Sequence, residues 1–304
     1  MSDMLILLAP LIVLVIVVLF GFVGCGGEPF TSRDTPPEQP PETPPTEPSE
    51  PYAKNIEATT GFLALWPLNE TSGIVAVATS PILNIDGEYK PGATPGSEGA
   101  FFHKEPNVNF APELNGTTGY IEVPFHEQLN PSTDPVRFSV ELWVKPAGGI
   151  PDGEERIVIS SHHTSDTGNH RGYEIALVGT GAGDATVRGR VFHINDGAAE
   201  IDVTLTSGDP SEWRHIVVTY DGPAETLTVY ATVVGTIFDK AAAKQTAAKY
   251  SPVQAGGGQR PLRFGAGHLQ AGQAEEFFAG RIDEVAFYQA VLPDVTAEAH
   301  FNLF

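Results

Sequence analysis

Apolar and polar residues alternate in short runs from Gly61 to the C-terminus. Clear examples are Phe62–Trp66, Arg137–Pro146, Arg214–Tyr220 and Gly280–Tyr288. A period of two predicts strands that bury one face, and Gly- and Pro-rich turn signals separate the runs. The strands are too many for one open sheet and no regular helices intervene, so the pattern predicts an all-β fold of two packed antiparallel sheets.

Two segments of this region have a helical pattern instead. Ala241–Lys249 is a helical stretch in what should be a loop, and Pro293–Phe301 predicts one or two terminal helical turns.

The N-terminus predicts a membrane anchor. Leu5–Gly24 carries no charge, and about 18 apolar residues suffice to cross a bilayer as a helix. Phe22–Gly27 also resembles the cleavage box of bacterial lipoproteins, in which Cys25 would be lipidated, although the basic start of such signals is missing. Lipidation and an uncleaved anchor both stay open. Either one ties the chain to a membrane, with the domain expected outside the cytoplasm, at the cell surface or in the periplasm.

A stalk and one domain are expected after the anchor. Thr35–Pro51 consists of proline, acidic and small polar residues, and it cannot build a core. In a polyproline II conformation these 17 residues span roughly 50 Å. The predicted organisation is therefore an anchor or signal over residues 1–27, a disordered stalk over 28–56 and a β-sandwich over 57–304.

Charge and cysteine content narrow the function classes. The 38 Asp and Glu residues outnumber the 17 Lys and Arg residues, for a net charge of −21. Nucleic-acid binding needs clustered cations, so nucleic acid is not an expected partner. Cys25 precedes the globular region, and no disulfide is possible within the fold.

Five blocks in order carry a family likeness: Leu63–Gly73, Leu114–Pro124, Phe138–Pro146, Trp213–Gly222 and Phe278–Phe301. Together they resemble the laminin G-like branch of the concanavalin A-like lectin/glucanase jelly rolls. The likeness covers the domain and not the anchor or stalk. It implies a two-sheet antiparallel β-sandwich whose first and last strands pair, and a binding function for glycan or protein.

The resemblance also implies a possible role for Ca²⁺. In relatives the position of Asp283 either bonds a neighbouring loop or helps to hold the ion, and Ca²⁺ takes six to eight oxygen ligands. Candidate metal ligands are Asp283, Asn69, Asn115 and the carbonyl region of Gly116. Consecutive strand residues face opposite ways, so Asp283 and Glu284 are not expected to act as an acid/base pair.

Two polar loops are candidates for a ligand rim, since Asp, Asn and His side chains can bond sugar hydroxyls. The loops lie within Ser161–Glu174 and His193–Glu200. The rim candidates are Asp166, Asn169, His170, Asn195 and Asp196. His162, His163 and His170, with Asp166 between them, have loose spacing for zinc, which wants three or four ligands, so a hydrated loop is expected there.

A hydrolase is the alternative function. Glu200 and Asp202 lie in phase on one strand, but Thr204 and Leu205 occupy the positions where glucanases carry a third acid. Two in-phase carboxylates on an exposed strand are more often a solvated face. Trp66, Trp143 and Trp213 lie within strands and are expected in the core.

The sequence therefore predicts a non-enzymatic surface recognition or adhesion module for glycan or protein, assisted by Ca²⁺. A glycoside hydrolase and a structural surface or virion component are the alternatives, because a fold alone does not choose among them.

Overall fold

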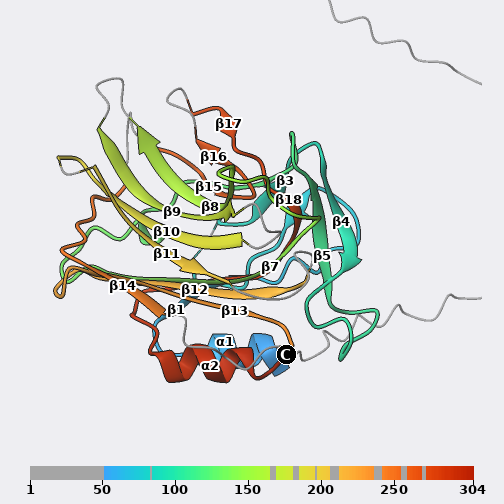
Figure 1. Cartoon of the computed structure of the whole chain (residues 1–304). Helices are drawn as coiled ribbons and strands as arrows, with labels where there is room; N and C mark the ends of the chain where they lie inside the picture. Colours follow the sequence, from blue (N-terminus) through green and yellow to red (C-terminus); the bar gives the residue numbers. More distant parts are fainter. Residues whose placement is uncertain are drawn as a thin grey trace, which may run out of the picture. The chain divides into compact units, whose positions relative to one another are not determined.

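A computed structural model describes residues 51–82, 84–164, 169–180, 185–195, 197–205, 212–235, 242–254, 259–268 and 272–304. Within these residues most of the chain forms antiparallel strands in two large sheets (Figure 1). The predicted all-β sandwich is confirmed. The predicted anchor, the lipidation candidate Cys25 and most of the predicted stalk lie outside the described residues.

The first sheet, sheet A, has the strand order β14-β13-β12-β7-β18-β5-β4, and β1 also pairs with β18. Its strands are β1 (Phe62–Trp66), β4 (Ala93–Glu98), β5 (Phe110–Asn115), β7 (Arg137–Pro146), β12 (Arg214–Asp221), β13 (Thr226–Val233), β14 (Ala242–Thr246) and β18 (Ala279–Tyr288). The first and last strands of the domain, β1 and β18, pair as the family resemblance implied, with Trp66 opposite Val285.

The second sheet, sheet B, has the strand order β11-β10-β9-β8-β15-β6-β3-β2. Its strands are β2 (Val75–Ala76), β3 (Gly87–Tyr89), β6 (Ile121–Val123), β8 (Glu155–Thr164), β9 (His170–Gly179), β10 (Ala185–His193), β11 (Gly197–Thr204) and β15 (Leu262–Phe264). A small hairpin of β16 (Gly267–His268) and β17 (Ala274–Glu275) and the short 3-10 helix η1 (Glu127–Leu129) complete these elements.

The hydrophobic core lies between the two sheets. Each strand supplies alternate residues, for example Val140, Leu142 and Val144 from β7. Trp66 packs there edge-on against Phe264 at a centroid distance of 5.2 Å. The alternation that predicts these strands therefore also determines which of their side chains fill the sandwich.

A second apolar layer covers the outer face of sheet A. Helices α1 (Pro51–Ala58) and α2 (Asp294–Phe301) lie side by side under this sheet (Figure 1). Trp143 and Trp213 belong to this layer rather than to the core between the sheets. The other face of strand β7 thus packs on helices, which explains why its sequence is apolar on both sides.

Three local predictions need correction or confirmation. Ala242–Thr246, within the expected helix of residues 241–249, is strand β14, because it pairs with β13 at the edge of sheet A. The terminal helical turns are confirmed as α2. The predicted stalk boundary at residue 56 falls inside α1, whose Tyr52 and Ile56 are buried in the second apolar layer.

Candidate functional site

Sheet B leaves its outer face free of the two helices, and this face carries a row of polar residues in direct cross-strand register. Neighbours along the strands, such as Val191 and Ile175, point into the core, so the row points outward. We call this set the charge row. Its members, in order across the sheet, are Glu200, Arg190, Glu174, Ser160, Arg263 and Glu122.

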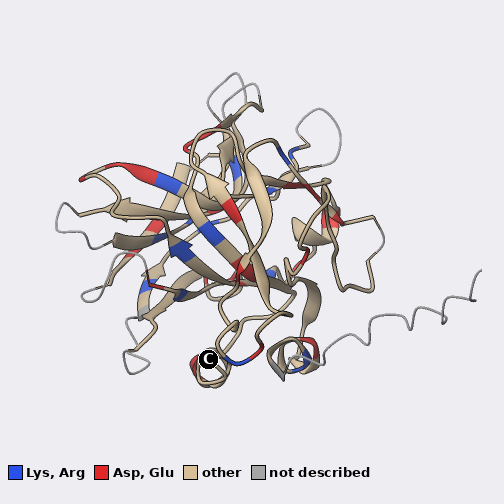
Figure 2. Cartoon of the chain, turned by 90° about the vertical axis from the view of Figure 1, so that its right-hand side faces the viewer, with Lys and Arg blue, Asp and Glu red and all other residues tan. Residues whose placement is uncertain are grey.

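The arginines of this face neutralise the acids suggested for hydrolysis. Arg190 bonds Glu200 at 3.1 Å and Glu155 at 2.8 Å. Arg188 holds Asp202 in a two-pronged pair at 2.7 Å for both bonds. Figure 2 shows that acidic and basic residues lie on strands as well as in loops. Glu200 and Asp202 are thus in phase and exposed, as predicted, and both are bound in ion pairs.

Glu174 occupies the centre of the charge row and is almost completely buried. The Ser160 hydroxyl donates to Glu174 Oε1 at 3.0 Å, and Arg190 Nη1 lies 3.4 Å from Oε2. Burial outweighs both partners and raises the pKa of Glu174 to about 7. This carboxyl group therefore changes charge near neutral pH.

A stack of aromatic rings lies next to the charge row. His162 and Phe192 sit on either side of Gly172, and their rings stack at a centroid distance of 3.9 Å. The glycine is required, because a Cβ on Gly172 would lie 1.7 Å from the carbonyl oxygen of Ser161. His162 and His170 are strand residues of β8 and β9, so the expected hydrated loop is wrong for them: His162 is buried.

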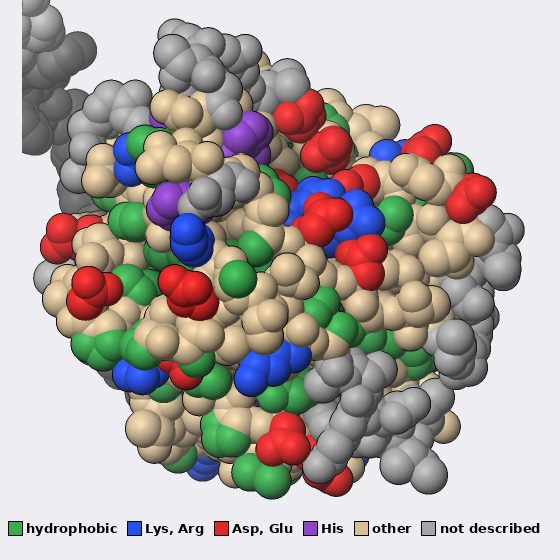
Figure 3. Space-filling model, turned by 60° about the vertical axis from the view of Figure 1, so that its left-hand side comes forward, with side chains coloured by type: hydrophobic (Ala, Val, Ile, Leu, Met, Phe, Trp, Pro, Cys, Tyr) green, Lys and Arg blue, Asp and Glu red, His purple; other side chains and the backbone are tan. Residues whose placement is uncertain are grey.

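The pKa of His162 is lowered to about 3, first by burial and then by the charges of His170 and Arg190. His162 Nε2 lies 3.0 Å from His170 Nδ1, and Thr164 Oγ1 lies within hydrogen-bonding distance of both nitrogens. The result is a compact group of two imidazole nitrogens and one hydroxyl oxygen. On the face shown in Figure 3, histidine side chains and a patch of Lys/Arg among acidic side chains lie on the same side of the molecule.

The two predicted rim loops lie at one end of sheet B. Strands β8 and β9 join at this end, and so do β10 and β11, because Phe192 pairs with Gly172. Asn169, His170 and Asn195 are therefore brought together at this end as predicted candidates. Asp166 and Asp196 lie outside the described residues.

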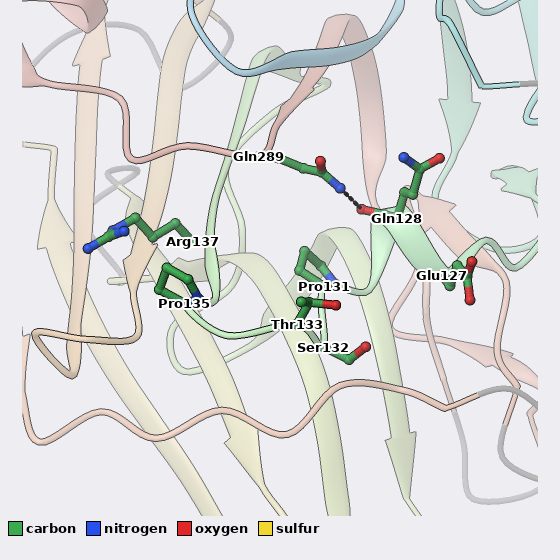
Figure 4. Close-up of a pocket in the computed structure, with 8 residues that line it drawn as sticks. All are labelled: Glu127, Gln128, Pro131, Ser132, Thr133, Pro135, Arg137 and Gln289. Carbon is green, nitrogen blue, oxygen red and sulfur yellow. Dashed lines mark hydrogen bonds between the residues drawn. The ribbon is translucent and has the colours of Figure 1, made fainter.

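A pocket of about 420 Å³ is lined mainly by the segment from Glu127 to Arg137 (Figure 4). It lies on the segment that includes η1, which is tied to β8 and β9. Ser161 donates to Asn130 at 2.6 Å, and the Tyr173 hydroxyl donates to the Leu129 carbonyl at 3.0 Å. Its lining residues are Glu127, Gln128, Pro131, Ser132, Thr133, Pro135, Arg137 and Gln289.

The pocket offers mixed hydrogen-bonding groups rather than one charge. Gln289 donates to the Gln128 carbonyl at 3.4 Å, and Arg137 pairs with Asp221 at 3.0 Å. Hydroxyl groups come from Ser132 and Thr133. We call the pocket together with Asn169, His170 and Asn195 the rim surface.

The metal candidates separate into two places. Asp283 accepts from the Ala100 amide at 2.8 Å, and Asn69 accepts from the Phe110 amide at 2.7 Å. Asn109 lies between Asn69 and Glu284, at 3.5 and 3.3 Å. The buried Asp283 and the half-buried Asn69 thus belong to one polar cluster around Asn109.

The expectation that Asp283 and Glu284 face opposite ways is wrong. The register of β18 with β7 shifts between Asp283 and Ala286, and Glu284 has φ of 49°. Both Ile282 and Val285 point into the core, so this β-bulge places the two carboxylates between them on the side of Asn109. The alternation rule fails because one extra residue is inserted into the strand.

Asn115 and Gly116 lie elsewhere. Asn115 pairs with Ala279, four positions before Asp283 on β18, which is roughly 13 Å along a strand. Its side-chain oxygen accepts from the amides of Thr117, Thr118 and Gly119. Among the described residues, no three His, Cys, Asp or Glu side chains are grouped in a way that would hold a metal ion.

Sequence reasoning missed a buried carboxylate under the helices. Glu141 of β7 is fully buried and accepts from Tyr52 at 2.9 Å, Tyr288 at 2.8 Å and His215 at 2.7 Å. His300 Nδ1 lies 3.0 Å from both carboxylate oxygens. We call this set the Glu141 cluster. The signal in the sequence is a lone acid within the apolar run 138–144.

The partners of Glu141 keep its carboxyl group ionised despite its burial. Burial by itself would raise the pKa of Glu141, but the hydrogen bonds and charges of His215 and His300 hold it well below its usual range. One carboxylate therefore links α1, α2 and sheet A. It lies beneath the helices, away from the rim surface.

The described residues include no helix long and apolar enough to span a bilayer.

The fold and the rim surface can now be compared with known proteins. The family model Laminin_G_3, described as the concanavalin A-like lectin/glucanases superfamily, matches residues 115–295. The match spans more than half of the chain, so the protein belongs to this superfamily. No curated protein matches the chain.

Solved structures of toxin binding domains share the fold. The binding domain of Paraclostridial Mosquitocidal Protein 1 has a TM-score of 0.53 and 17% identity, over 81% of this chain and 52% of that one. A structure of botulinum neurotoxin type C has a TM-score of 0.55 and 12% identity, over 83% and 53%. That toxin depends on interaction with two ganglioside molecules to enter cells. This chain therefore spans about half the length of these structures.

Proposed function

We propose that the domain is a non-enzymatic surface recognition module that binds glycan or protein ligands at the rim surface. The observation behind the proposal is a polar pocket whose lining segment is tied to β8 and β9, the two strands that flank the first predicted rim loop. Amide, hydroxyl and guanidinium groups are suited to hydrogen-bonding sugar hydroxyls or peptide groups. Loops on a rigid sandwich commonly carry binding functions.

Two further facts support a binding role. The superfamily includes lectins, and the toxin domains with this fold are binding domains. The acids of the hydrolase alternative, Glu200 and Asp202, are both engaged by arginines, which makes them poor candidates for a nucleophile and a proton donor.

The test is a glycan array probed with the purified full-length chain. Binding to a defined set of glycans is expected. A parallel assay for release of reducing ends from β-glucans should give no activity in the wild-type chain. Activity that is lost in Glu200→Gln would support the hydrolase and contradict the proposal. If the array is empty and no protein ligand is captured, the structural alternative replaces recognition.

Calcium assistance is part of the proposal, centred on Asp283 and Asn69. Both side chains provide oxygen atoms in one polar cluster, and Ca²⁺ prefers such ligands. Asn115 and Gly116 would not contribute to the same ion, because Asn115 caps its own turn roughly 13 Å away.

Membrane attachment rests on the sequence alone. The uncharged run Leu5–Gly24 motivates an N-terminal anchor, with the domain outside the cytoplasm at the cell surface or in the periplasm. Fractionation of cells that express the full-length chain should place it in membranes. Cys25→Ser separates the two forms: release of the chain from membranes, or accumulation of an unprocessed form, indicates lipidation, and an unchanged distribution indicates an uncleaved anchor.

A further inference from the structure

The group at the ends of β8 and β9 brings three polar side-chain atoms within 3.3 Å of one another. His162 Nε2 and His170 Nδ1 are 3.0 Å apart, and Thr164 Oγ1 lies 3.3 Å from the first and 3.2 Å from the second. The two rings are nearly parallel, with an interplanar angle of 10°. Two facing imidazole nitrogens can share one proton, or they can both donate lone pairs to a cation.

The spacing suits a small divalent metal. Zinc binds histidine nitrogen at about 2.0–2.1 Å, so two such bonds span nitrogens 3.0 Å apart at roughly a right angle. A tetrahedral angle needs a separation of about 3.4 Å, which a shift of a few tenths of an ångström in His170 would supply. His170 is half-buried at a strand end, and such a shift does not disturb the core.

The surroundings prepare His162 to act as a ligand. His162 is buried and its Nε2 atom lies next to His170 Nδ1 and Thr164 Oγ1. Its other ring nitrogen, Nδ1, lies 4.0 Å from Glu174 Oε1, and Ser160 holds that carboxylate. The ring of Phe192 stacks on the ring of His162 and limits its movement.

We propose that His162 and His170 form a binding site for a first-row transition metal, Zn²⁺ or Cu²⁺, with the Thr164 hydroxyl beside it. Imidazole ligands favour these ions over Ca²⁺, so the site is distinct from the calcium site proposed at Asp283. Because the described residues offer no third His, Cys, Asp or Glu ligand here, the site binds with moderate affinity. Cu²⁺ should bind more tightly than Zn²⁺.

The site stands independently of the proposed recognition function. Metal binding itself needs only the chain and no glycan or protein ligand. The two ideas therefore fail separately.

The test is metal titration of the full-length chain, purified without a histidine tag and treated with EDTA. Calorimetry with Zn²⁺ and with Cu²⁺ should show one equivalent bound. Electron paramagnetic resonance of the Cu²⁺ form should show two nitrogen ligands. His162→Ala and His170→Ala should each weaken binding at least about tenfold, because each removes one of the two nitrogen ligands.

His103→Ala is the matched control, because His103 stacks on Phe304 far along the chain from these strands and should leave affinity unchanged. His170→Gln keeps a hydrogen-bonding side chain and serves if the alanine variant does not fold. Equal binding by wild type, His162→Ala and His170→Gln, or no saturable binding of either metal by folded wild-type chain, would overturn the proposal.

Discussion

Replacing Glu141 by alanine tests how the two helices are held to sheet A. The substitution removes the acceptor for Tyr52, Tyr288, His215 and His300, all of which are buried. Breaking a buried, hydrogen-bonded charge pair costs about 3–5 kcal/mol, because the partners keep their desolvation penalty. For a domain of this size, that loss lowers the melting temperature by roughly 6–20 °C.

Urea denaturation followed by tryptophan fluorescence measures this effect. Trp143 is a suitable reporter, since its ring lies 4.8 Å from His215 in the Glu141 cluster. Glu113→Ala is the control, because Glu113 is exposed and pairs with Arg281 at 3.4 Å, so its loss should cost less than about 1 kcal/mol. If both variants lose the same small stability, the helices do not depend on Glu141 and the reasoning is refuted.

The lowered pKa of Glu141 also predicts that the folded domain loses stability at acidic pH. Its pKa in the folded chain is lower than the ordinary value of 4.5, so the stabilisation is complete above pH 4.5 and is lost as the pH falls toward the folded value. Wild-type stability should therefore decrease below pH 4.5, and the decrease should be smaller in Glu141→Gln. A parallel pH dependence of wild type and variant would contradict this assignment.

Three further predictions concern the outer face of sheet B and the calcium proposal. Gly172→Ala should lower the free energy of unfolding by about 3 kcal/mol or more in urea titrations, since Gly172 has φ of 99° and an added Cβ would clash with Ser161. Gly148 has open space around it, so the control Gly148→Ala should change the free energy of unfolding by less than about 0.5 kcal/mol. The raised pKa of Glu174 means that folding stability is lost as the pH rises from 4.5 through about 7. Glu174→Gln should therefore be more stable than wild type at pH 8 by up to about 3 kcal/mol. Equal stability of the two proteins at pH 8 would refute the raised pKa. Added Ca²⁺ should raise the melting temperature of wild type but not of Asp283→Asn, and an absence of any shift would reject the calcium proposal.

The period-two pattern was enough to predict the sandwich, and the family resemblance implied that its first and last strands pair. Trp66 lies opposite Val285 because the first and last strands pair, as the ordered blocks implied. The pattern fails where a local feature changes the alternation. The bulge at Glu284 turns Asp283 and Glu284 to one side, and edge pairing with β13 makes a strand of 242–246 despite its alanine-rich composition.

The candidate site was only partly predictable. The loops around His170 and Asn195 could be found from their polar composition, and the sheet order brings them together. The Glu141 cluster could not be predicted from local composition, because the partners of Glu141 come from strands and helices far apart in the sequence. Burial of His162 also depends on its stacking with Phe192 across a glycine, which no local pattern indicates.

The most direct test of the account compares ligand affinity in rim variants and a distant control. A glycan or protein ligand identified with the full-length chain is titrated against Gln289→Ala, Asn195→Ala and Glu113→Ala. At least one of the two rim variants should bind roughly five- to tenfold more weakly, because it loses a hydrogen bond worth about 1–1.5 kcal/mol. Glu113→Ala should bind as tightly as wild type. Unchanged binding in both rim variants, with a loss in the control, would place the ligand away from the rim surface and contradict the central claim.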